Sequence, residues 1–146
     1  MVVFNIIPDR NYTPGAPDQK LANLEKAIRL TEELNLPRLG GTEMNSPGQK
    51  FVDDFESAEL SPFHPVFLRG SRILHAHSTL QRHCGMGYLS DWAQDQFSGV
   101  GVKNEFYAEF GDVFSPRGDE RLADSLHSEM GSGEVLTLAR ESMERI

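Results

Sequence analysis

Polar side chains that can bind metal ions or move protons follow three apolar runs of this 146-residue chain. Asp9 and Arg10 come after an apolar hexamer, Glu43 follows a run that ends in two glycines, and His75 and His77 follow a third run. Carboxylate oxygens and neutral imidazole nitrogens are common ligands of divalent metals, and a carboxylate can also act as a general base. The residue types therefore indicate a metal site or an acid–base site.

Parallel strands joined by crossover helices would bring these segments together, because every strand then delivers its last residues to the same edge of the sheet. Residues 2–7 are β-branched, aromatic or apolar except for Asn5, which is typical of a strand covered on both faces. A second strand before Glu43 is expected to be short, because Pro37 delays its start and Gly40 and Gly41 weaken its ladder. Two glycines there can also let a ligand approach the backbone.

Helices are predicted between these strands. Apolar residues at helical spacing predict a helix over 18–35, and a second helix is expected from Ser61-Pro62 to Gly70, which is interpreted as its C-cap. Residues 72–76 then form a third strand. The predicted fold class is therefore α/β, with short parallel strands and crossover helices, as in part of a TIM-like barrel.

Helices alone are predicted after Gly85. We expect residues 1–84 to form the strand–helix units and residues 85–146 to form a helical extension packed on the same domain. Three amphipathic stripes mark the three helices of the extension: Phe106, Tyr107, Phe110 and Phe114; Leu122, Leu126 and Met130; and Val135, Leu138, Ala139 and Met143. The aromatic stripe can be core or interface, and core is the commoner case.

The charge of the chain excludes some partners. A net charge of -8 without a basic stripe argues against nucleic acid, whose phosphates need clustered Lys and Arg. No apolar run approaches the length of a membrane span, and no secretion signal is visible at the N-terminus. A single cysteine, Cys84, fits a reducing compartment. We therefore expect a cytoplasmic protein that binds neither nucleic acid nor membrane.

The pair His75 and His77 has two interpretations. On a strand, residues at i and i+2 point to the same side, so both imidazoles could face one metal ion together with a carboxylate from Asp9 or Glu43. In the alternative, one histidine caps a turn or bonds to the backbone and the other is exposed.

Arg10 and Glu43 also have two interpretations each. Arg10 can bind a small anionic substrate in bidentate fashion, or it can pair with an acidic neighbour at the rim of the site. Glu43 can bind metal or act as a general base, whereas its neighbours Thr42 and Asn45 are also typical of a turn.

Three sequence pieces carry a resemblance to a known family: Ile-Ile-Pro-Asp-Arg-Asn at 6–11, Gly-Thr-Glu-Met-Asn at 41–45, and the passage that ends in His75-Ala76-His77. The segment from 2 to 79 resembles the later βα units of PHP-type metal-dependent phosphoesterases, which have distorted TIM-like barrels. The resemblance implies strand-end His, Asp and Glu ligands for metal ions that activate water against a phosphate ester, with Glu43 and His77 as the best matches. The family's early strand with a His-x-His pair has no counterpart before residue 2.

The leading hypothesis is a metal-dependent hydrolase, or the C-terminal part of one. Its divalent metal, zinc or manganese, would be held by Asp9, Glu43, His75 and His77, and Glu43 and Arg10 would act on the substrate. One alternative is a non-catalytic interaction module that docks a partner through the helical extension. Another is a TIM-like isomerase or lyase that uses Glu43 as a base without metal.

The edge strand of the predicted sheet should need another chain segment to pair with its backbone. A parallel sheet of few strands leaves backbone donors and acceptors unpaired at its edges, and residues 2–7 would form such an edge strand. We therefore expect this strand to be covered either by a missing N-terminal portion or by a second copy of the chain in a homodimer.

Overall fold

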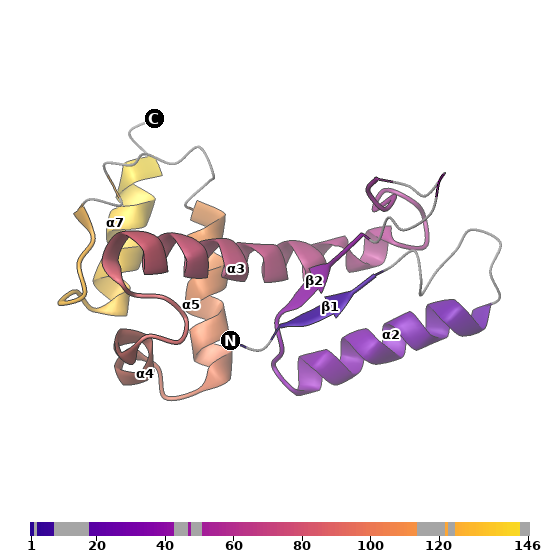
Figure 1. Ribbon diagram of the computed structural model, residues 1–146, viewed down its shortest axis with the longest axis horizontal. Coiled ribbons are helices and arrows are strands. Elements are labelled where there is room, and N and C mark those ends of the chain that lie inside the picture. The colour runs from indigo at the N-terminus through magenta and orange to yellow at the C-terminus, as the bar shows by residue number, and fades with distance from the viewer. Residues whose placement is uncertain are drawn as a thin grey trace. The chain divides into compact units, whose positions relative to one another are not determined.

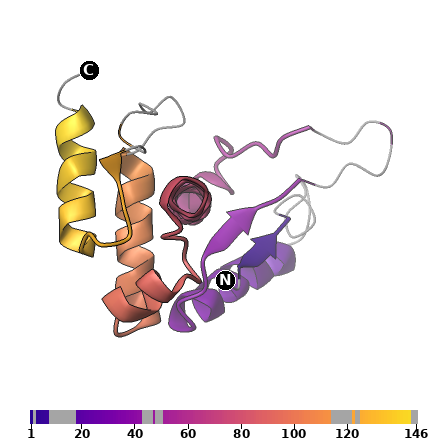
Figure 2. The same ribbon diagram turned by 60° about the vertical axis from the view of Figure 1, so that its left-hand side comes forward.

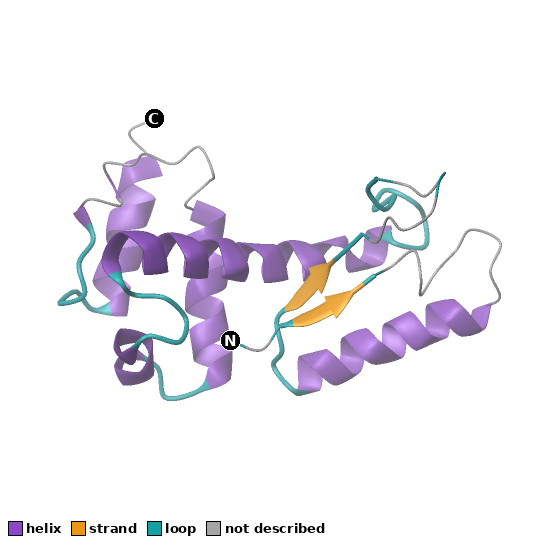
Figure 3. Ribbon diagram, viewed as in Figure 1, coloured by secondary structure: helices purple, strands orange, loops and turns teal. Residues whose placement is uncertain are grey.

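The computed structural model describes residues 1, 3–7, 18–42, 47, 51–113, 122 and 125–143. These residues form a mixed α/β fold that is mostly helical (Figures 1 and 3). Two compact units divide within α3: an N-terminal unit, Val2–Gly70, and a C-terminal unit, Ser71–Ile146 with Met1. The elements in chain order are β1 (Phe4–Ile6), α2 (Asp18–Glu33), β2 (Arg38–Gly40), the 3-10 helix η1 (Ser61–Phe63), α3 (His64–Cys84), α4 (Asp91–Gln96), α5 (Val100–Val113) and α7 (Ser132–Met143).

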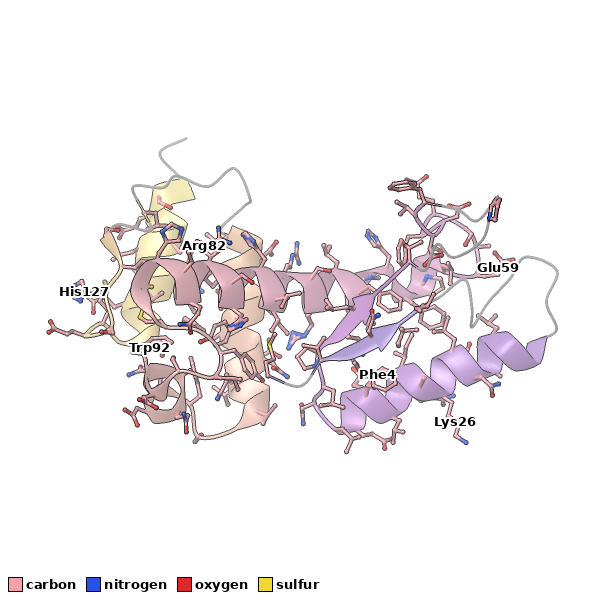
Figure 4. All side chains as sticks on the ribbon, viewed as in Figure 1. Phe4, Lys26, Glu59, Arg82, Trp92 and His127 are labelled. Carbon is pink, nitrogen blue, oxygen red and sulfur yellow. The ribbon has the colours of Figure 1, made fainter. Side chains whose placement is uncertain are left out.

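Helix α2 confirms the helix predicted over 18–35 and shows how it ends. Leu24 and Ile28 are buried on one side of it, and Lys26 points away from the sheet in Figure 4. Asn35 has a φ of 52°, and the N–H of Leu36 donates to the carbonyl of Thr31 at 2.8 Å. Asparagine tolerates this left-handed conformation, and the bond satisfies a carbonyl of the last turn. The turn directs the chain from α2 into β2.

Strands β1 and β2 pair in parallel, as predicted. Phe4 lies opposite Arg38 and Ile6 lies opposite Gly40. The N–H of Phe4 donates to the carbonyl of Pro37 at 2.9 Å, and the N–H of Gly41 donates to the carbonyl of Ile6 at 2.8 Å. The ladder therefore continues one residue beyond β2 at its carboxyl end.

The expectation that the first strand is buried on both faces is wrong. Ile6 is buried in an apolar cluster with residues of α2 and α3, but Phe4 is 42% exposed and Asn5 is also exposed. Among the described residues of β1, Ile6 alone belongs to this cluster. The cluster consists of Ile6, Leu24, Ile28, Leu60 and Phe67.

The third strand predicted over 72–76 is also wrong, because these residues lie inside α3. Phe67, Ile73, Ala76 and Leu80 are buried at spacings of three, four or six residues, a helical pattern that runs straight through Gly70. Gly70 is therefore no C-cap. A Cβ on Gly70 would overlap the backbone carbonyl of Arg38, so glycine is needed where α3 crosses β2.

The C-terminal unit is built from helices around an aromatic core. Trp92, Phe97, Phe106 and Tyr107 form a chain of ring contacts with centroid separations of 5.0–6.2 Å, and Nε1 of Trp92 donates to the carbonyl of Met130 at 2.8 Å. Helices α5 and α7 lie side by side in both views (Figures 1 and 2) and are joined by an ion pair between Glu109 and Arg140.

The helices predicted for this unit are confirmed in part. Phe106, Tyr107 and Phe110 are core residues of α5, and α7 matches the third predicted stripe, whereas Phe114 lies outside the described residues. The helix predicted through Leu126 and Met130 is wrong at its end. Residues 126–130 form a turn that buries both side chains without a helix. Within the described residues, no helix combines the length and the apolar character needed to cross a bilayer.

Replacing Gly70 with alanine should destabilise the protein by about 3 kcal/mol, because the new Cβ overlaps a backbone carbonyl that no side-chain rotation can move. Urea unfolding measures this loss. Gly133→Ala in α7 is the matched control, since a Cβ there meets no atom within 4 Å, and it should leave stability unchanged or raise it by up to about 1 kcal/mol. Equal unfolding free energies for Gly70→Ala and the wild type would refute the crossing of α3 over β2.

Candidate functional site

The carboxyl edge of the β1–β2 sheet is where the predicted carboxylates begin. Asp9 follows Ile6 by three residues, Glu43 follows Gly40 by three residues, and Ile6 and Gly40 are register partners. Asp9, Arg10 and Glu43 themselves lie outside the described residues.

Asn5 is a polar residue at this edge to which sequence analysis assigned no role. It pairs with Leu39, and the alternation of side chains in a strand places Gly41 on the same face. A Cβ built on Gly41 would lie 2.7 Å from both Nδ2 and Oδ1 of Asn5. The carboxamide therefore occupies the space that the missing side chain of Gly41 leaves. Its polarity within an apolar strand was the feature of the sequence that could have identified it.

Arg38 carries a charge at the opposite, amino end of β2. Its Nε and Nη1 atoms are buried and have no hydrogen-bond partner among the residues that the structure describes. Burial lowers the pKa of this guanidinium, the Glu32 carboxylate opposes that effect, and Arg69 adds to it. Arginine still keeps its charge at neutral pH. Because Arg38 starts the strand, it does not belong to the edge at which Asp9 and Glu43 begin.

His75 and His77 do not share one side of a strand, because both lie in α3. Two residues of an α-helix that are two positions apart are separated by about 200° around the helix axis. The expectation that both imidazoles face one metal ion from a strand is therefore wrong in its premise. Both side chains are half-buried.

His77 bonds to the backbone instead, which is the alternative that the sequence left open. Its Nδ1 accepts the N–H of Tyr88 at 3.0 Å. This bond uses the lone pair of Nδ1 and leaves the proton of the neutral ring on Nε2, so neither nitrogen offers a lone pair to a metal ion in this tautomer. Burial lowers the pKa of His77, and the nearby amino terminus of Met1 lowers it further. Both effects favour the neutral acceptor.

The segment from Met86 to Tyr88, which His77 holds through its bond to the N–H of Tyr88, is fixed by further polar contacts. The hydroxyl of Tyr88 donates to Oδ1 of Asn104 at 2.6 Å, and that of Tyr107 donates to the carbonyl of Met86 at 2.7 Å. Lys103 lies with Nζ 5.1 Å from the centre of the Tyr88 ring. Burial raises the pKa of both tyrosines, so they stay neutral phenols at physiological pH. These groups lock a buried turn and have no visible catalytic role.

No cluster of three or more His, Cys, Asp or Glu side chains suited to a metal ion occurs among the described residues. Cys84 donates its thiol to the carbonyl of Leu80 at 3.1 Å, and burial raises the pKa of this thiol. It therefore resembles an inert, partly buried cysteine more than a nucleophile.

A separate groove of about 480 Å³ opens between α2 and η1 in the N-terminal unit. Its walls are largely apolar, with charged groups at Glu25, Arg29 and Glu59. Glu25 and Arg29 lie one helical turn apart, with 4.0 Å between Oε2 and Nη2. Of the residues predicted to do chemistry, the structure describes His75 and His77, and neither is among the described residues that line this groove. Its lining is Leu21, Glu25, Ile28, Arg29, Ala58, Glu59, Pro62 and Phe63.

Comparisons of the chain with protein-family models, with curated proteins and with solved structures found no match.

Stability should fall in mild acid because of His77. Folding lowers the pKa of His77 from an unfolded value of about 6.5. The contribution of neutral His77 to the free energy of unfolding is therefore complete above that pH, and it is lost as the pH falls toward the pKa of the folded state. Urea unfolding at about pH 7.5 and at about pH 5 measures this effect. The free energy of unfolding should fall more between the two pH values in the wild type than in His77→Asn. Asparagine can accept the same N–H and does not titrate.

His77→Ala removes the acceptor altogether and should cost about 1 kcal/mol at the higher pH. Equal acid sensitivity of the wild type and His77→Asn would show that another group governs the effect.

Proposed function

We propose that this chain is a metal-dependent hydrolase of phosphate esters, or the C-terminal part of one, with Asp9 and Glu43 as metal ligands. One observation carries the proposal: β1 and β2 are parallel and in register, and a carboxylate follows each strand by the same three residues. Polar groups that follow parallel strands in this way form the active sites of α/β enzymes. The resemblance of residues 2–79 to PHP-type phosphoesterases supports the same reaction.

The proposed metal is manganese in preference to zinc. With His75 and His77 on a helix, the donors that remain at the edge are carboxylate oxygens, and oxygen donors suit Mn²⁺ better than the N and S ligands typical of Zn²⁺. One or two carboxylates together with substrate phosphate can hold a small hard cation. When bound, such an ion polarises a phosphoryl oxygen and lowers the pKa of water.

Arg10 completes the proposed site as the residue that orients the substrate. It directly follows Asp9 in sequence and is proposed to lie at the same edge of the sheet. A guanidinium can hold two oxygens of a phosphate group in a fixed orientation. The substrate class is therefore a small anionic ester, and Glu43 is available to accept a proton where it does not bind the metal.

A partial TIM-like barrel is the fold that we propose for this enzyme. The β1–α2–β2 unit is interpreted as one repeat of a partial TIM-like barrel in a cytoplasmic enzyme. The edge of β1 is proposed to be covered by a second copy of the chain, because a two-stranded sheet is rarely stable alone.

The two alternative functions are an interaction module and a metal-free isomerase or lyase. The interaction module was argued from the helical extension, whose aromatic stripe could be core or interface. Phe106, Tyr107 and Phe110 are 4%, 0% and 0% exposed, which counts against docking through these three residues. A metal-free isomerase or lyase with Glu43 as its base is separated from the proposal by chelation.

Asp9→Asn and Glu43→Gln should each weaken Mn²⁺ binding at least tenfold, because a neutral amide replaces a charged ligand. Isothermal titration with MnCl₂ measures the affinity, and hydrolysis of p-nitrophenyl phosphate should vanish with EDTA and return with Mn²⁺. Glu33→Gln, the same change at the exposed end of α2, should leave both unchanged. Unaltered Mn²⁺ affinity in both site variants would refute the metal ligands. Activity that survives exhaustive chelation would favour the metal-free base.

A further inference from the structure

The groove between α2 and η1 has the size and the lining of a small-molecule site. Its volume of about 480 Å³ lies within the range of about 300–1,000 Å³ that is typical of such sites. Leu21, Ile28 and Phe63 supply apolar surface to it. Ile28 belongs to the apolar cluster of the N-terminal unit, whereas Leu21 and Phe63 pack against that cluster and are only half-buried. A ligand in the groove would complete their burial.

The charged side chains that line this groove leave one carboxylate uncompensated. Oε2 of Glu25 and Nη2 of Arg29 lie 4.0 Å apart on α2, so these two charges offset each other. Glu59 lies in the turn that precedes η1 (Figure 4). Its side chain is half-buried, and no hydrogen bond or ion pair joins it to another residue in the part of the chain that the structure describes. The groove therefore has an excess of one negative charge next to apolar side chains.

We propose that this groove binds a small organic cation, with an ammonium group against Glu59 and an apolar body on Leu21 and Phe63. Charge complementarity favours this class of ligand, because an anion would be repelled by the uncompensated carboxylate and a neutral molecule would cover it without pairing it. The net charge of -8 attracts cations to the chain as a whole. The proposal uses none of the residues of the proposed metal site, so it is tested independently of the hydrolase.

The test is titration of 4-phenylbutylamine, an ammonium group on an apolar body, into the full chain without added metal. Amide chemical shifts in NMR spectra show where the compound binds, and they should change along α2 and in residues 58–63. 4-Phenylbutyrate carries a carboxylate on a similar body and should bind about tenfold more weakly. If 4-phenylbutyrate binds as tightly as the amine, or if about 10 mM amine causes no shift at the groove, the proposal is overturned.

Glu59→Gln tests the residue that pairs with the ammonium group. It keeps the size of the side chain and removes its charge, and it should weaken 4-phenylbutylamine binding about fivefold, the loss typical of a partly exposed ion pair. The affinity for 4-phenylbutyrate should not fall in this variant. Glu56→Gln, the same change at an exposed carboxylate that does not line the groove, is the matched control and should leave both affinities unchanged. Wild-type affinity for the amine in Glu59→Gln would contradict the proposal.

Ala58→Trp tests the groove without a change of charge. Ala58 lines the groove and is exposed, so a large side chain there should fill the space while the core stays intact. We expect 4-phenylbutylamine binding to be lost in this variant, with folding verified by circular dichroism. Wild-type affinity in folded Ala58→Trp would show that the compound binds elsewhere and would overturn the proposal.

Discussion

The hydrogen bonds between β1 and β2 fix the register of the two strands, on which the proposed site depends. A slip of one residue in their register would turn every side chain of one strand to the other face and would move Asn5 away from Gly41. The register is held by Ile6, which must enter the apolar cluster, and by the bond from Gly41 to Ile6. The candidate site is therefore a consequence of backbone pairing more than of any side-chain contact.

Two parallel strands of three residues each do not stabilise themselves, so other contacts must hold them. The left-handed turn at Asn35 aims the chain into β2, and Gly70 lets α3 approach the backbone of β2 directly. Leu24, Ile28 and Phe67 then bury Ile6. On the face that carries Asn5, Asn5 itself is exposed and its register partner Leu39 is half-buried.

Local patterns allowed α2, α5, α7 and the parallel pairing to be predicted, because helical spacing and strand composition are properties of neighbouring residues. The prediction of a third strand was wrong because Gly70 was interpreted as the end of a helix. Glycine is needed at this position because the helix contacts the backbone of Arg38, which is far away in sequence. That error also placed His75 and His77 on a strand. The bond from Tyr88 to His77 and the carboxamide of Asn5 against Gly41 are likewise tertiary contacts, which no spacing rule reveals.

Anomalous diffraction from crystals soaked in Mn²⁺ locates the metal ion and so tests the proposed site. One manganese peak is expected at the carboxyl edge of β1 and β2, with carboxylate oxygens of both Asp9 and Glu43 within about 2.5 Å of it. Carboxylates more than about 8 Å apart could not share an ion with bonds of that length. Such a separation, or a peak located at His75 or His77 with none at the sheet edge, would contradict the proposed site.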